Sequence, residues 1–89
     1  MHIVLTIVGK DKVGIIAKAS QLLAENKVNI ININQNIMDG FFNMVLIADM
    51  ADASISLQEL RTKATALGEE LGVEIRVQSE DIFSAMHSI

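Results

Sequence analysis

The sequence predicts an α+β protein with the ferredoxin-like βαββαβ order, in which a four-stranded antiparallel sheet is covered on one face by two helices. Three observations predict this fold: the order of the periodic segments, a strong hairpin signal at Asp39-Gly40, and a difference between the strands. The first and third strands of such a sheet are central, and these segments are apolar on both sides. The last strand alternates, as an edge strand does. Residues 1–89 are expected to form one domain.

The first half of the chain predicts a strand, a helix and a second strand. An apolar run from Ile3 to Val8 is typical of a buried strand. Gly9 and Gly14 then bracket a polar loop, and a helix is expected from about Val13 to Asn26. Its apolar side has helical spacing and comprises Ile15, Ile16, Ala19, Leu22 and Leu23. The second strand is expected from Val28 to Met38.

The second half begins with a hairpin. Asp39-Gly40 favours a two-residue turn, so Phe41 to Met50 should pair with the preceding strand. Ser56 and Glu59 have the spacing of a capping box, which predicts the start of a second helix. The apolar positions of that helix are Leu57, Leu60, Ala64, Leu67 and Leu71.

The C-terminal part of the chain predicts a last strand and a short helix. Gly72 suits the C-terminal cap of the second helix, and Val73 to Val77 alternates between apolar and charged residues. The tail from Ser79 to Ile89 is expected to form a short helix. Its apolar residues Ile82, Phe83 and Met86 are expected to pack on the body.

The apolar character of Phe41 to Met50 on both sides predicts self-association. Helices cover only one face of this fold, so apolar residues on the other face need a second cover. The core is also small, because the chain has 89 residues and only three aromatic side chains. We expect the cover to be another subunit, and hence a homodimer.

Composition excludes several kinds of partner. The net charge of -4 argues against nucleic acid, which needs clustered basic residues. The absence of cysteine excludes disulfides and thiolate zinc sites. His2 and His87 are isolated, so neither a metal site nor a cofactor is expected. No signal segment or 18-residue apolar span is present, which favours a cytoplasmic protein with no membrane partner.

Catalysis is not expected, and neither are three other uses of the fold. Serine is plentiful but has no histidine in a recognisable arrangement, and no carboxylate pair stands in a pocket-forming context. RNA recognition needs exposed aromatic residues on a basic sheet. A heavy-metal carrier needs a pair of cysteines in the first loop. An acylphosphatase needs an arginine there, whereas Arg61 and Arg76 are the only arginines.

The loop from Gly9 to Ile16 is the best candidate for a binding site. A helix that begins near Val13 presents unpaired N–H groups and a positive dipole end, which favour a small anion. Each residue also has a structural explanation. Gly14 could permit close packing of the helix on a strand, Asp11 could cap the helix, and Asn29 could simply start the next strand.

The motif Asp11-Lys12-Val13-Gly14-Ile15-Ile16, followed by Asn29-Ile30, resembles the signature of the ACT domain. The resemblance covers nearly the whole chain and is greatest to small stand-alone ACT proteins related to the transcriptional repressor of the glycine cleavage system. Many members have proline where this chain has Val13.

The resemblance implies a regulatory module that binds a small amino acid or similar metabolite at a dimer interface and acts on an effector protein. The ligand-binding residues that it implies are Asp11, Val13, Gly14, Ile15, Asn29 and Ile30. The alternative is a homodimeric interaction module without a ligand, which would dock another protein through its open sheet face or edge strand. Asn32, Asn34 and Asn36 are expected to share one face of that edge strand.

Overall fold

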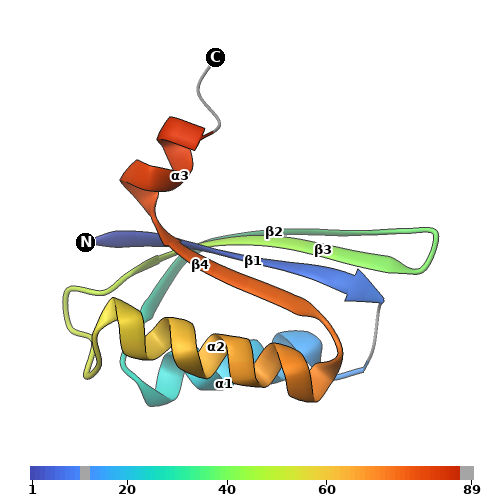
Figure 1. The fold of residues 1–89 in the computed structure, drawn as a ribbon, viewed down its shortest axis with the longest axis horizontal. Helices are drawn as coiled ribbons and strands as arrows, with labels where there is room; N and C mark the ends of the chain where they lie inside the picture. The colour runs from blue at the N-terminus through green and yellow to red at the C-terminus, as the bar shows by residue number, and fades with distance from the viewer. Residues whose placement is uncertain (11–12, 87–89) are drawn as a thin grey trace.

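The chain folds into one antiparallel sheet with two helices packed beneath it (Figure 1). This computed structural model describes residues 1–10 and 13–86. The elements are β1 (His2–Lys10), α1 (Ile15–Glu25), β2 (Asn29–Met38), β3 (Phe41–Asp49), α2 (Leu57–Leu71), β4 (Glu74–Ser79) and α3 (Glu80–Met86). The strand order is β2-β3-β1-β4, with β1 and β3 central and β4 at an edge. The predicted ferredoxin-like fold is confirmed.

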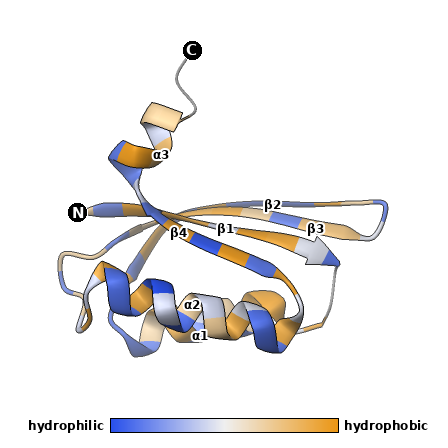
Figure 2. Cartoon of the chain, viewed as in Figure 1, coloured by the Kyte–Doolittle hydropathy of each residue, from blue (hydrophilic) through white to orange (hydrophobic). Residues whose placement is uncertain are grey.

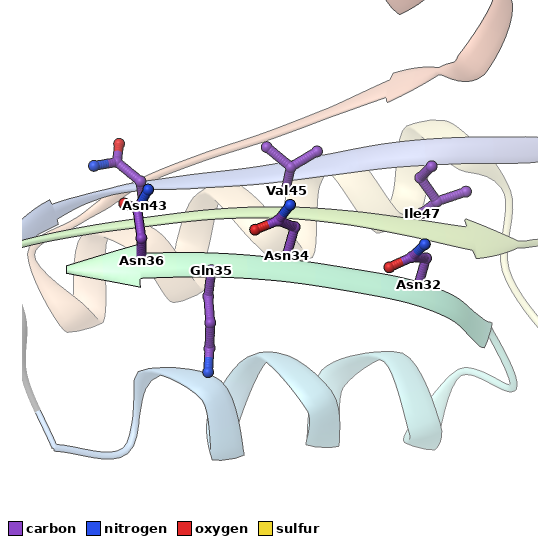
Figure 3. A pocket seen from close by; sticks show the side chains of 7 residues that line it. All are labelled: Asn32, Asn34, Gln35, Asn36, Asn43, Val45 and Ile47. Carbon is purple, nitrogen blue, oxygen red and sulfur yellow. The ribbon is translucent and has the colours of Figure 1, made fainter.

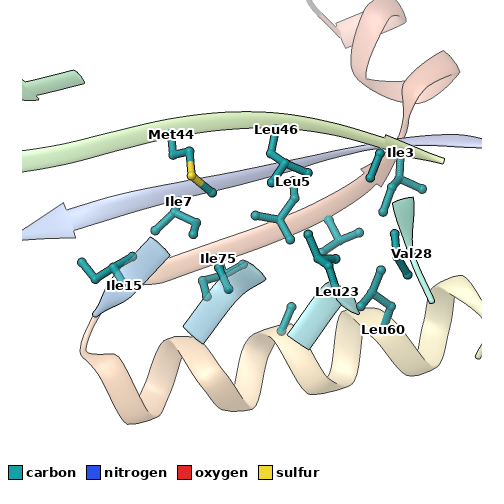
Figure 4. Close-up of a cluster of buried hydrophobic side chains, with 14 of the residues drawn as sticks. Ile3, Leu5, Ile7, Ile15, Leu23, Val28, Met44, Leu46, Leu60 and Ile75 are labelled. Carbon is teal, nitrogen blue, oxygen red and sulfur yellow. The ribbon is translucent and has the colours of Figure 1, made fainter. Parts of the chain in front are cut away.

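The hydrophobic core lies between the sheet and the two long helices (Figure 4). Leu5 and Leu46 sit opposite each other on β1 and β3, and both are almost fully buried. Leu23 from α1 and Leu60 from α2 fill the helix side of the same layer. Apolar and polar residues alternate along β4, as Figure 2 shows, because successive side chains point to opposite sheet faces.

The sheet face away from α1 and α2 is called the open face below. Its central residues are Thr6 and Val8 from β1, Asn43, Val45 and Ile47 from β3, and Asn32, Asn34 and Asn36 from β2. Phe41 and Val45 are 50% and 41% exposed there. The expectation that β3 is apolar on both sides is therefore confirmed.

The hairpin was predicted correctly in its turn and its pairing. Asp39 and Gly40 both have positive φ, 51° and 80°, as a two-residue turn of the primed type requires. Met38 consequently pairs with Phe41. A register shift between Ile30 and Asn32 was not anticipated, because a bulge leaves no clear mark in so polar a strand.

Gly9 belongs to β1 and does not open the loop, so the predicted start of the loop is wrong. It pairs with Phe42, and the strand continues to Lys10. A β-carbon on Gly9 would lie 2.7 Å from Cγ1 of Val73. The residue is therefore glycine because Val73 packs directly against the backbone of β1.

Two apolar positions in the tail differ from prediction. The predicted helix is present as α3, but Ile82 and Met86 are 53% and 60% exposed. These side chains are exposed because α3 follows β4 without a loop and projects away from the body (Figure 1). Ile16 is also more exposed than predicted, at 37%, because it lies at the edge of the apolar side of α1.

The capping box at the start of α2 is confirmed and makes stability depend on pH. The Ser56 N–H donates to the Glu59 carboxylate at 3.1 Å, and the Glu59 N–H donates to Ser56 Oγ at 3.1 Å. The backbone hydrogen bond from Ser56, followed by its hydroxyl, lowers the pKa of Glu59. A lowered carboxylate pKa stabilises the fold above the unfolded-state pKa, and this stability is lost as the pH falls through the folded-state pKa.

Replacing Ser56 with alanine should lower the free energy of unfolding by about 1 kcal/mol at pH 7, because an N-cap is lost.

In urea titrations at several pH values, Glu59→Gln should be less stable than wild type at pH 7. This difference should shrink as the pH falls from about 5 towards 3. A difference between the two proteins that stays constant over this range would contradict a role for the Glu59 charge.

Candidate functional site

The candidate site begins where β1 passes into α1. Gly14 is the N-cap of α1 and has φ of 92°, a backbone conformation that residues with a side chain rarely adopt. A β-carbon built on Gly14 would have no atom of a described residue, other than its chain neighbours, within 4 Å. The explanation that Gly14 allows close packing is therefore wrong. Glycine is needed for the sharp turn into the helix, and it leaves open space above the backbone.

The other predicted residues of this loop differ in what they expose. The Val13 side chain is fully exposed, whereas that of Ile15 is 1% exposed and belongs to the core. Only the backbone of Ile15 is thus available to a ligand. Asp11 lies outside the described residues, so its predicted contact and its alternative as a cap stay untested.

The first turn of α1 is uncapped by side chains in the described part of the chain. No side chain accepts a hydrogen bond there, and the turn contains no acidic residue. Helix α2 differs, since Ser56 and Glu59 satisfy its first N–H groups. The first N–H groups of α1, which no described side chain caps, and the positive dipole end of the helix can therefore hold an anion such as a carboxylate.

Asn29 and Ile30 lie at the opposite end of α1. This helix has 11 residues and is about 16 Å long, and β2 begins after it. Asn29 is exposed and pairs with Asp49, whereas Lys10 pairs with Phe41 at the far end of the sheet. Figure 1 shows the two ends well apart. One chain does not bring the two predicted halves of the site together.

Asn29 and Ile30 also face different sides of the sheet. Asn29 stands opposite Asp49 on the open side, while Ile30 stands opposite the buried Ala48. Ile30 is partly buried and packs against the core. A ligand at this strand end would therefore meet the backbone and amide of Asn29 and one side of Ile30.

Strand β2 is a long edge strand without charge. It pairs with β3 on one side only, and its ten residues include no Asp, Glu, Lys or Arg. Ile31, Ile33 and Ile37 are 50%, 40% and 58% exposed. Edge strands normally carry charges or breaks that prevent pairing with another strand. An edge of this kind is suited to pairing with a second chain.

A hollow of about 490 Å³ lies on the open face over the β2–β3 hairpin (Figure 3). The predicted asparagine row lines it, and register places Asn32 opposite Ile47, Asn34 opposite Val45 and Asn36 opposite Asn43. Gln35 points to the other side of the sheet, toward α1 (Figure 3). The lining is uncharged, so it can offer hydrogen bonds and apolar contact.

A polar cluster occupies the end of the open face where α3 begins. His2 Nδ1 lies 3.1 Å from Glu80 Oε2, and His2 Nε2 lies 3.9 Å from Asp49 Oδ2. The Ala51 N–H donates to Asp49 at 2.9 Å, and this hydrogen bond is the main reason that the pKa of Asp49 is lowered. Within residues 1–10 and 13–86, no three His, Asp or Glu side chains are placed to hold a metal ion.

His87 lies outside the described residues. Among the helices that the structure describes, none is long and apolar enough to cross a membrane.

Comparison with known proteins identifies the family. A family model of the ACT domain matches residues 1–78. A UPF0237 protein of Listeria innocua is 46% identical over 89 residues, which span both chains completely. The solved structure of an ACT domain protein from Streptococcus pneumoniae has a TM-score of 0.81 at 38% identity, covering 93% of each chain.

A more distant structure shares the fold. It is described as a glycine cleavage system transcriptional repressor and has a TM-score of 0.76 at 21% identity, covering 86% of this chain and 43% of that one. The match of the family model runs from β1 almost to the end of β4 and includes the uncapped turn at Gly14. The chain therefore belongs to the ACT domain family.

Proposed function

We propose that this chain is a non-catalytic regulatory module that binds a small amino acid or similar metabolite between two copies of itself. The observation that carries the proposal is the bare, uncharged edge of β2. Pairing of this edge with a second copy completes a site that one chain leaves divided. The family supports the regulatory role, because ACT domains are typically regulatory ligand-binding modules.

The pairing follows from the register of the sheet. Two β2 strands joined antiparallel about a two-fold axis put the Asn29 end of one strand beside the Met38 end of the other. Met38 pairs with Phe41, and Phe41 pairs with Lys10, so the Met38 end is also the end where β1 leads into α1. Gly14 of one chain would then lie at the same end as the partner's Asn29.

The chemistry of this junction suits an amino acid. The free N–H groups at the start of α1 would hold its carboxylate, and the oxygen of the partner's Asn29 amide or of Asp11 would accept from its ammonium. A helix N-terminus contributes only about 0.3 to 2 kcal/mol, whereas micromolar affinity needs about 8 kcal/mol. The remainder requires contacts from both chains and exclusion of water, which is why site and dimer form together.

The test is a binding screen on wild-type protein and two glycine variants. Isothermal calorimetry against the twenty amino acids should find at least one ligand. Gly14→Ala should weaken its binding at least about tenfold, because the new methyl group fills the space above the α1 N–H groups. Gly72→Ala is the matched control, since Gly72 also has positive φ, 71°, but caps α2 away from β2.

Both variants should lose similar stability from backbone strain, about 1 kcal/mol. Only Gly14→Ala should lose affinity. If Gly14→Ala and Gly72→Ala lose affinity equally, the loss is caused by lower stability and not by a filled site. If the wild-type protein binds none of the twenty amino acids, the proposal of an amino-acid ligand is overturned.

The alternative is an interaction module that pairs with itself and docks an effector protein without a ligand. The uncharged hollow at Asn34 and Val45 favours it, because interface centres are poor in charge. Under this alternative, affinity capture from the native cell recovers one stoichiometric partner, and Gly14→Ala captures it as well as wild type does.

A further inference from the structure

The open face is covered at one end and bare at the other. Val4 and Val8 lie on the same strand and the same side of the sheet, yet they are 3% and 49% exposed. Helix α3 stands over the Val4 end and contacts β1 and β4 (Figure 1). At the other end, Phe41 and Val45 add exposed apolar surface to that of Val8.

Helix α3 has apolar surface that its own chain leaves bare. Its first turn is held where Glu80 lies against His2 and the Ile82 N–H donates to Ser79 Oγ at 3.3 Å, and at its other end Gln78 Nε2 donates to Met86 Sδ at 3.5 Å. Ile82 and Met86 nevertheless remain more than half exposed. An isolated helix of seven residues is unstable in water, so its exposed side needs a surface to pack on.

Asp81 on α3 can complement Lys10 at the bare end, where Asp39 in the β2–β3 turn is the acidic neighbour. Lys10 lies at the bare end and forms no ion pair with a described residue. Asp81, in the first turn of α3, likewise has no ion-pair partner in the described part of the chain. Arg76 and Glu74 on β4 neutralise each other at 2.8 Å. Between its ends the open face of β1, β2 and β3 carries no charge.

We propose that a second copy of this chain packs on the open face with its strands antiparallel to those of the first. The two-fold axis lies between the two sheets. Each α3 then covers the bare end of the other copy, so Ile82 and Met86 meet Val8 and Phe41. Asp81 approaches the partner's Lys10.

The size of the face suits a stable pair. The four strands are six to ten residues long, and at a spacing of about 4.8 Å they make a footprint of roughly 550 Å². The sides of the two α3 helices add to this footprint. The surface buried on each partner is then close to that of a standard interface, which is about 800 Å². This contact uses the open face, whereas ligand binding uses the β2 edge. Both contacts are isologous, and where their two-fold axes cross at right angles they close an assembly of four chains.

Substitutions that introduce one charge on the open face or on α3 test the contact. The mass of the assembly is measured by sedimentation equilibrium. Val45→Glu and Ile82→Glu change residues that are 41% and 53% exposed, so both variants should fold, as circular dichroism would verify. Each should halve the mass of the wild-type assembly. Ala66→Glu, on the exposed side of α2, is the matched control and should leave the mass unchanged. Unchanged mass in both Val45→Glu and Ile82→Glu would overturn the proposal.

Engineered cysteines test the antiparallel arrangement, because the natural chain has none. Met86 Sδ lies 3.5 Å from Gln78 Nε2, and Gln78 pairs with Val4, whereas Phe41 pairs with Lys10 at the other end of β1, about 20 Å away along the strand. A disulfide between Met86→Cys and Phe41→Cys therefore cannot form within one chain. The double variant should give a covalent dimer on mild oxidation, and neither single variant should. No covalent dimer from the double variant would overturn this arrangement.

Discussion

Replacing Ile33 with lysine is expected to halve the mass of the assembly and to weaken amino-acid binding at least about 100-fold. Ile33 stands opposite Leu46, so it is on the helix side near the middle of β2. A two-fold axis through paired β2 strands would put the new lysine beside its own copy. Two like charges at the centre of an interface oppose association, and an inward-facing edge lysine prevents strand pairing.

Mass and binding should be measured on the same preparation, with Ala66→Lys as the control on α2. The expected result is a joint loss, because the proposed site needs both chains. If the Ile33→Lys assembly dissociates and the separated chains still bind the ligand with wild-type affinity, the site lies within one chain. In addition, Ile33→Lys combined with Val45→Glu should give monomers, since each substitution acts on a different contact.

Replacing Gly68 with alanine should lower the free energy of unfolding by about 1 to 3 kcal/mol, the usual range for overpacking. A β-carbon on Gly68 would lie 2.7 Å from the backbone oxygen of Val73. That oxygen cannot easily move, because the Val73 N–H donates to Gly68 O at 2.9 Å and fixes the turn into β4. The helix would have to lift from the strand and expose the core around Ile75.

Urea unfolding should measure the loss, with Gly9→Ala as a comparison. The added methyl group at Gly9 comes closest to Cγ1 of Val73, at 2.7 Å, and the backbone Cα of Val73 lies at 3.1 Å, so shortening that side chain removes the closest contact. Val73→Ala should therefore partly rescue Gly9→Ala and should not rescue Gly68→Ala. At an exposed helix position, alanine is more stable than glycine by about 1 kcal/mol. A gain of that size at position 68 would show that α2 does not pack tightly on β4.

Local signals predicted the elements because each depends on few neighbouring residues. Asp39-Gly40 specifies its own turn through positive φ, and Ser56 with Glu59 specifies the start of α2. The central positions of β1 and β3 were predictable because both strands carry apolar residues on both sides of the sheet. These features need no knowledge of distant parts of the chain.

What the sequence could not predict depends on long-range contacts or on direction. Gly9 was assigned to the loop because its contact, Val73, is 64 positions away in the chain. The exposure of Ile82 and Met86 depends on the direction in which α3 leaves β4, which no pattern in the tail specifies. Gly14 and Asn29 belong to one motif, yet the length of α1 separates them.

The uncharged edge of β2 has a further consequence for the cell. Six residues from Asn29 to Asn34 combine β-branched and amide side chains without proline or charge, a composition that also favours stacking into fibrils. In the proposed assembly the partner's β2 would cover this segment. Assembly would then protect the strand from fibril formation as well as complete the proposed site.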